Sequence, residues 1–292
     1  MLDPELYAVV KRIEFSARKR AAHGMAGAWN SAFKGNGMAF SEVREYIPGD
    51  EVRFIDWNVT ARTGVPHIKT FVEERELTLI LAIDVSASGL FGTLQRSKAA
   101  IMARLAAILA CSAMTNNDKV GLYLFSDKLE KYIPPAKGRK HVLRLVQEVL
   151  TFVPESKGTR IGVCLDLLHK LQCKHSVIFI FSDFFDDNWE KSLAKLNQKH
   201  EVVAIPVNDP GEAELPKIGL ALFKDAETGE LFWADTTNKN FIQKSTEALA
   251  QNIIERDLKI KQSGVASIPI ILKETDRDTI VPLEQYFRRK HH

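Results

Sequence analysis

The sequence predicts an α/β fold with a doubly wound, mostly parallel sheet, preceded by an N-terminal extension of helix and short strands. From Leu77 onward, continuous apolar runs of strand length alternate with longer segments of helical periodicity. Continuous apolar strands separated by helices are typical of a parallel sheet that is covered on both faces. The 292 residues suffice for one such domain at 77–290 and a substantial extension at 1–76.

Four apolar runs are the predicted parallel strands, and four helical segments lie between them. The strands are expected at Leu77–Ile83, Val120–Phe125, Ser176–Phe181 and Val202–Val207. The helices are expected at Leu94–Met114, His141–Phe152, Ile161–Leu171 and Trp189–Gln198. The first of these helices is apolar but carries Arg104, which favours a buried helix over a membrane span.

The pattern changes after Val207. The segment LALFKDAETGELFWAD predicts a β-hairpin with its turn at Asp225–Gly229. A long polar helix is expected at about Lys239–Lys261. A strand at Ser267–Leu272 and a short helix that begins at Pro282 complete the predicted domain.

The N-terminal extension has a different composition. It begins with a basic amphipathic helix at roughly Glu5–Ala22, followed by the glycine-rich stretch GAWNSAFKGNGMAF. The turn residues in SEVREYIPGDEVRFIDWNVTARTGVPHIKTF predict short strands and loops. We expect the extension to pack on the main domain, because three of its aromatic residues require burial: Phe54, Trp57 and Phe71.

Charged residues of alternating sign in the extension favour an internal ion-pair network over a second binding surface, which is the alternative. The expected network consists of Arg44, Asp50, Arg53 and Asp56.

Composition and charge exclude several classes of function. The net charge is only +3, and no long basic stripe is present, so we expect no nucleic-acid partner. The three cysteines, Cys111, Cys164 and Cys173, form no CxxC pair, which indicates reduced thiols. With no secretory signal and no long uncharged apolar stretch, we expect a cytoplasmic protein without a membrane span.

The strand at Leu77–Ile83 ends in the pattern Asp84-x-Ser86-x-Ser88. In an open parallel sheet, ligands bind beyond the carboxyl ends of the strands. One carboxylate and two hydroxyl groups are hard oxygen donors, which suit Mg²⁺ or Mn²⁺ better than zinc. Because magnesium takes six oxygens, further ligands are expected on neighbouring loops of the same edge.

Two other loops carry such oxygens. Thr159 precedes a predicted helix in SKGTRIGVCLDLL, and Asp183 follows a predicted strand in SVIFIFSDFFDD. Taken alone, Thr159 is better explained as a helix cap than as a metal ligand. The combined set of candidate metal ligands is Asp84, Ser86, Ser88, Thr159 and Asp183.

This set resembles the metal-ion-dependent adhesion site of von Willebrand factor A domains. The stretch GNGMAFSEVREYIPGDEVRFIDWNVTAR, followed by DVSASGLFGT, also resembles the bacterial family catalogued as domain of unknown function 58, and the resemblance covers most of the chain. This chain has Gly89 where a methionine is common and Glu51 where a second aspartate is common. Neither residue is a candidate ligand.

The resemblance implies a von Willebrand factor A-type domain in which the serines and the threonine bind the ion. The aspartates act directly or through water, and a partner's Glu or Asp completes the coordination. The resemblance also implies an adaptor that works with a MoxR-type AAA+ ATPase or its client. The expected function is therefore metal-dependent protein–protein interaction and not catalysis.

The enzymatic alternative is a Mg²⁺-dependent phosphohydrolase with Asp84 as its nucleophile. Haloacid-dehalogenase-like enzymes require a second carboxylate two positions later, where this chain has Ser86. A metal-dependent nuclease would require more clustered carboxylates, and Asp186 and Asp187 are better explained as the solvated start of a helix. The sequence contains neither HExxH nor GxSxG, so no catalytic site is predicted.

Overall fold

The computed structural model describes residues 37–74, 77–86, 97–156, 158–172, 174–210, 219–224, 231–273 and 275–290. The predicted helix at Glu5–Ala22, the hairpin turn at Asp225–Gly229 and Ser88 lie outside these ranges. The chain divides into two compact units, one at Phe33–Leu77 and one that holds the described residues from Thr78 onward. The expected packing of the extension on the main domain stays a prediction.

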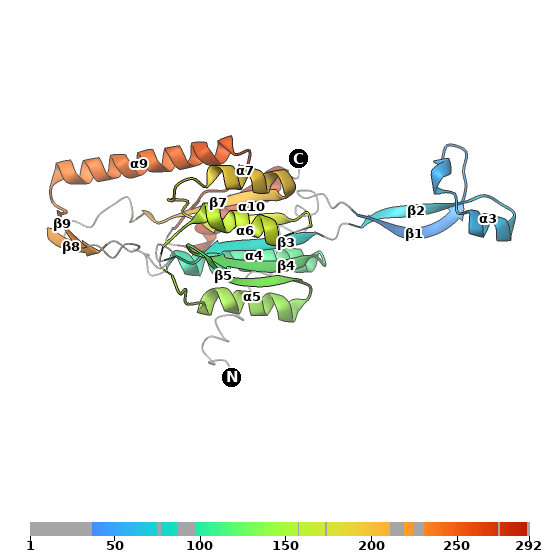
Figure 1. The fold of residues 1–292 in the computed structure, drawn as a ribbon, viewed down its shortest axis with the longest axis horizontal. Helices are drawn as coiled ribbons and strands as arrows, with labels where there is room; N and C mark the ends of the chain where they lie inside the picture. Colours follow the sequence, from blue (N-terminus) through green and yellow to red (C-terminus); the bar gives the residue numbers. More distant parts are fainter. Residues whose placement is uncertain are drawn as a thin grey trace. The chain divides into compact units, whose positions relative to one another are not determined.

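The larger unit contains a central sheet with the strand order β10-β7-β6-β3-β4-β5, and β11 also pairs with β7 (Figure 1). Its strands are β3 (Thr78–Asp84), β4 (Lys119–Phe125), β5 (Leu129–Ala136), β6 (Val177–Ser182), β7 (Glu201–Asn208), β10 (Ala266–Ser267) and β11 (Ile270–Ile271). All neighbours pair in parallel except β4 and β5. The predicted α/β class with a mostly parallel sheet is therefore confirmed.

Strand β5 was not predicted from the sequence. It is an antiparallel edge strand that contains Pro134 and Pro135, and edge positions tolerate proline because they need fewer backbone donors. In the neighbouring strand β4, a Cβ atom at Gly121 would lie 3.0 Å from Pro135 Cγ. The glycine therefore gives the prolines of β5 room to pair.

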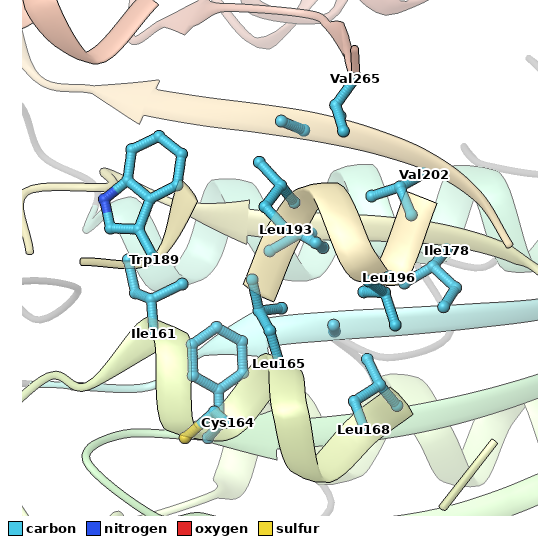
Figure 2. Packing of buried hydrophobic residues seen from close by; sticks show 14 of the residues in the cluster. Ile161, Cys164, Leu165, Leu168, Ile178, Trp189, Leu193, Leu196, Val202 and Val265 are labelled. Carbon is cyan, nitrogen blue, oxygen red and sulfur yellow. The ribbon is translucent and has the colours of Figure 1, made fainter. Parts of the chain in front are cut away.

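Helices cover both faces of the sheet. They are α4 (Lys98–Thr115), α5 (Arg139–Thr151), α6 (Ile161–Leu171) and α7 (Glu190–Lys199), each within a few residues of its predicted range. Because side chains alternate along a strand, Ile80 and Ala82 of β3 point to the same face and belong to one buried cluster with residues of α6 and α7. Figure 2 shows Leu165 of α6 and Leu193 of α7 in this cluster. On the opposite face, α4 contacts β3 and β4, and α5 packs against α4.

Helix α4 is long and apolar enough to cross a membrane by length and composition alone. Within the fold, 72% of this stretch is buried. The helix packs against the sheet, and its charged Arg104 is half-buried. The predicted buried helix is confirmed.

The C-terminal part of the chain agrees with the sequence only in part. Strands β8 (Leu220–Lys224) and β9 (Leu231–Asp235) form the predicted antiparallel hairpin, and α9 (Lys239–Gln262) is the predicted long polar helix. The predicted strand at Ser267–Leu272 is instead two short parallel strands, β10 and β11, separated by Ile268 and Pro269. Proline has no backbone N–H to donate to the ladder, so it interrupts the strand.

The last helix, α10 (Asp276–Lys290), does not begin at Pro282 as predicted. It begins six residues earlier, because Thr275 caps it through a bond from the Asp278 backbone N–H to the Thr275 hydroxyl oxygen at 3.2 Å. Pro282 therefore lies inside the helix.

The smaller unit is an antiparallel hairpin of β1 (Gly37–Glu45) and β2 (His67–Glu74), with η2 (Val52–Phe54) and α3 (Trp57–Thr63) in the connection. The sequence predicted strands and loops here but not α3. Asp56 caps this helix by accepting hydrogen bonds from two backbone N–H groups of its first turn. Gly64 ends the helix in the left-handed region, with φ of 74°.

The predicted ion-pair network of this unit forms only in part. Arg44 and Asp50 make a two-bond pair, with both N···O distances 2.8 Å. Arg53 instead pairs with its neighbour Glu51. Asp56 caps α3 and lies 3.4 Å from the Lys69 ammonium.

The expected burial of the aromatic residues in this unit is wrong for Trp57, whose side chain is 67% exposed. Phe54 is half-buried, and the side chain of Phe71 lies outside the described part of the structure.

Burial of His200 predicts a pH-dependent stability. His200 is 2% exposed, its ring nitrogens have no hydrogen-bond partner among the described residues, and burial lowers its pKa to about 4. The unfolded chain takes up this proton near pH 6.5, so stability is present above that pH and is lost as the pH falls towards 4. We expect the His200→Phe variant to lack this part of the acid destabilisation, up to about 3 kcal/mol.

Urea denaturation of the wild type and the variant between pH 4.5 and 8 measures this effect. Parallel pH profiles for wild type and His200→Phe would contradict the assignment.

Candidate functional site

The carboxyl ends of β3 and β6 meet at one edge of the sheet. Asp84 is the last residue of β3 and Ser182 the last of β6, and the two strands pair in parallel up to Ile83 and Phe181. The Ser182 hydroxyl donates to Asp84 Oδ2 at 2.7 Å, and the Ser86 backbone N–H donates to Asp84 Oδ1 at 3.0 Å. Both oxygens of the Asp84 carboxylate are therefore oriented by neighbouring groups.

Asp84 is unfavourable as an anion in this environment. Asp84 is 3% exposed, and burial together with the charge of Asp183 raises the pKa of its carboxyl group to about 7. The hydrogen bonds from Ser182 and Ser86 act in the opposite direction but do not cancel the increase. Two carboxylates thus lie close together at this edge with little solvent to screen them.

Asp183 follows β6 directly and contacts two basic residues from distant parts of the chain. Lys98 Nζ lies 3.5 Å from Asp183 Oδ2, and the two side chains are 2% and 8% exposed. Arg256 of α9 donates through Nη1 to the Asp183 carbonyl at 3.0 Å and to Asn208 Oδ1 at 2.7 Å. Arg256 therefore connects the carboxyl ends of β6 and β7 through these two hydrogen bonds.

The loop that carries Thr159 is held by backbone contacts at its end. The Arg160 N–H donates to the Ser126 carbonyl, at the end of β4, at 3.2 Å. Helix α6 begins at Ile161 with Arg160 as its N-cap residue, so Thr159 is not the cap. The Ile161 N–H donates to Asp186 Oδ2 at 2.6 Å. Asp186 thus joins the Thr159 loop to the loop after β6, and its interpretation as a solvated helix start is wrong.

The loop between β6 and α7 has an unusual backbone. Phe184 and Asn188 both have left-handed φ values, 58° and 62°, which are costly for a buried, bulky phenylalanine. The Phe184 N–H donates to the Ser182 hydroxyl oxygen at 3.1 Å, which fixes the turn. A Cβ atom at Gly162 would lie 3.1 Å from the Asn188 carbonyl oxygen, so the glycine lets α6 approach this loop.

A cleft of about 370 Å³ adjoins the loop that follows Asp183. One wall is the β6–α7 loop, including the partly exposed Phe185, and the other is α9. The Arg256 guanidinium lies over the Phe185 ring at 5.4 Å, so the same arginine contacts both the cleft and Asp183.

The structure brings three of the predicted ligands together and leaves one outside the described residues. Asp84, Ser86 and Asp183 lie at the shared strand edge, Thr159 is half-buried on a loop tied to it, and Ser88 is not described. Sequence reasoning missed four residues that build the site: Ser182, Lys98, Arg256 and Asp186.

Each of these four residues contacts the site through its own side chain, and none belongs to a recognisable sequence motif. Only Ser182 had a signal, because it directly precedes a candidate ligand at a strand end. Among the described residues, no group of three or more His, Cys, Asp or Glu is placed to hold a metal ion. A metal at this edge would therefore depend on hydroxyl oxygens beside the two carboxylates.

Comparison with known proteins identifies the family. The family model described as "Protein of unknown function DUF58" matches residues 42–253. The chain belongs to the DUF58 family. The match spans most of the hairpin unit, the central sheet from β3 to β7 and the first part of α9.

Two mycobacterial proteins are similar to this DUF58 protein over nearly its whole length. An uncharacterized protein of Mycobacterium tuberculosis is 29% identical over 289 residues, which is 97% of this chain and 89% of that protein. An uncharacterized protein of Mycobacterium bovis matches to the same extent.

Among solved structures, the conserved hypothetical protein BatB from Bacteroides thetaiotaomicron is similar with a TM-score of 0.47 and 16% identity, over 73% of this chain and 98% of that one. The PilB minor pilin from Streptococcus sanguinis is similar with a TM-score of 0.41 and 11% identity, over 77% of this chain and 63% of that one.

The cost of an ionised Asp84 gives a first prediction for the DUF58 site. In EDTA at pH 8, the Asp84→Asn variant should melt higher than the wild type, because it removes a buried charge next to Asp183. A gain of about 1 kcal/mol corresponds to roughly 2–4 °C in a chain of this size. Differential scanning calorimetry measures the difference. A variant that melts lower would show that the ionised carboxylate stabilises the metal-free fold.

The bond between Asp186 and the first turn of α6 gives a second prediction. The Asp186→Ala variant should lose about 1 kcal/mol of unfolding free energy, because the Ile161 N–H then lacks its acceptor. The matched control is Asp187→Ala, at an exposed position of the same loop, which should change stability little. Equal losses in both variants, measured by urea denaturation, would exclude this specific role of Asp186.

Proposed function

We propose that this chain is a metal-dependent protein–protein interaction module built on a von Willebrand factor A-type domain. One observation carries the proposal. The buried carboxylates of Asp84 and Asp183, at the ends of adjacent strands, are close enough that the charge of Asp183 raises the pKa of Asp84. Such a pair requires a compensating cation, and a divalent metal ion supplies the largest charge in the smallest volume.

The donor atoms at this edge fit Mg²⁺ or Mn²⁺. They are carboxylate and hydroxyl oxygens, which these hard cations prefer, and no thiol or imidazole takes part. The proposed ligands are Asp84, Ser86, Ser88, Thr159 and Asp183. When bound, the ion supplies positive charge to which a partner's Glu or Asp can coordinate.

The chain's own residues hold this donor set in place before any ion binds. Ser182 and the Ser86 backbone orient the Asp84 carboxylate, and Arg256 fixes the backbone of Asp183. Asp186 ties the Thr159 loop to the loop after β6. A preorganised set of oxygens favours recognition, since little order has to be created on binding.

The proposed partner is a protein that offers a carboxylate, and resemblance favours a MoxR-type AAA+ ATPase or its client in the cytoplasm. The cleft between the β6–α7 loop and α9 lies next to Asp183 and can receive residues that flank the partner's acid. The proposal assigns the site no catalytic role.

Loss of metal-dependent binding in the Asp84→Ala variant tests the proposal. Immobilised wild-type protein should retain partners from a lysate of its own organism in Mg²⁺ but not in EDTA, and mass spectrometry identifies them. The Asp84→Ala variant should fold normally and retain none of these in either buffer. Asp166→Ala, at a half-exposed position of α6 that is not among the residues lining the cleft, is the control and should behave like the wild type.

Two results would contradict the proposed function. Partner binding that is unaffected by EDTA and by the Asp84→Ala change would exclude the metal mechanism. Hydrolysis of a generic phosphate ester by the wild type, abolished by Asp84→Ala, would instead support the Mg²⁺-dependent phosphohydrolase.

A further inference from the structure

A buried lysine lies beside one of the two carboxylates. Lys98 is the first residue of α4, and its side chain is 2% exposed. Its ammonium lies 3.5 Å from Asp183 Oδ2, although 85 residues separate the two in sequence. A lysine is almost never this deeply buried unless it is paired. Its position is therefore a specific feature of this edge of the sheet.

Among the described residues, the charges around Lys98 do not balance, because the Arg256 guanidinium pairs with Asp257 and reaches Asp183 only through its backbone carbonyl. Asp84 accepts a bond from Ser182, and Asp183 is the next residue, so two carboxylates share this edge with one ammonium group. A divalent ion would change the net charge of these groups from negative to positive, because two carboxylates then face one ammonium group and one dication. With Lys98 present the loaded site carries one net positive charge, and without it the loaded site is neutral.

From this charge balance we infer that Lys98 is the built-in counter-ion of the site, which weakens the binding of the divalent metal and strengthens the hold of the metal-loaded site on a partner carboxylate. The inference rests on the proposed function and adds a residue that sets its affinities. Like charges a few ångströms apart repel strongly where solvent screening is poor, which is the reason for the first effect. Uncompensated positive charge attracts an incoming anion, which is the reason for the second.

The Lys98→Met variant separates these two effects. It keeps the length and apolar stem of the side chain and removes the charge. We expect the variant to bind Mn²⁺ about tenfold more tightly than the wild type, since one repulsive charge is gone. Electron paramagnetic resonance of free Mn²⁺ measures the dissociation constant. The Lys98→Arg variant retains the charge and should stay close to the wild type. Lys140→Met, at an exposed position of α5, controls for the change in net charge.

Acetate is the probe for the anion. It should displace water from bound Mn²⁺ and lower the water-proton relaxation rate. Lys98→Met should need about tenfold more acetate than the wild type for the same effect, because its loaded site is neutral.

Stability gives an independent measurement. In EDTA, Lys98→Met should melt lower than the wild type, because its two carboxylates lose their only nearby ammonium among the described residues. Mn²⁺ should then raise the melting temperature of the variant more than that of the wild type. If Lys98→Met and a second variant, Lys98→Gln, both fail to fold even in saturating Mn²⁺, the metal cannot replace the lysine and the inference is wrong.

The outcomes distinguish this inference from the proposed function. Equal or weaker Mn²⁺ binding by Lys98→Met, with normal binding by the wild type, overturns the role of Lys98 and leaves the metal site intact. Mn²⁺ binding by Lys98→Met alone supports Lys98 as the resident cation and contradicts a metal site in the wild type. Absence of binding in both proteins overturns both proposals.

Discussion

The close approach of two buried carboxylates, Asp84 and Asp183, is the constraint on which the rest of this site depends. Desolvation and the nearby charge of Asp183 both disfavour the ionised form of Asp84, and directed hydrogen bonds and one buried ammonium group surround the pair. Each neighbouring group contributes a different part. Ser182 orients one carboxylate, Lys98 compensates the other, and Arg256 holds the backbone between the strand ends.

Parallel pairing explains why these groups meet. Strands β3 and β6 run side by side in the same direction, so both carboxyl ends reach one edge, although about 100 residues lie between them. The loops beyond that edge are then free to contact one another. The Asp186 carboxylate accepts a hydrogen bond from the first N–H of α6, whose N-cap residue provides no side-chain cap. The site is thus a consequence of topology more than of any one motif.

Most of the sheet was predictable because a strand buried on both faces has to be apolar along its length, as β3 and β6 are. The proline-rich edge strand β5 and the capped helix α3 were not, since neither shows the periodicity of its class. Asp84, Ser86 and Asp183 were found because oxygen-bearing side chains follow apolar strands. Lys98 and Arg256 could not be found, because each contacts Asp183 from more than 70 residues away.

A site of this kind stores unfavourable free energy that the remainder of the domain has to offset. The sheet, α6 and α7 bury a continuous set of apolar side chains on one face, among them Leu165 and Leu193 (Figure 2). Their burial stabilises the fold by about 1.5–3 kcal/mol per large side chain, so a few such residues together offset the cost of the displaced Asp84 pKa. The strained backbone at Phe184 is offset in the same way. The Phe184 ring packs against Trp189 with the ring centroids 5.3 Å apart, and the Phe184 N–H donates to the Ser182 hydroxyl oxygen. The apolar core therefore lets the strand edge keep two carboxylates that are stable together only when a cation lies beside them.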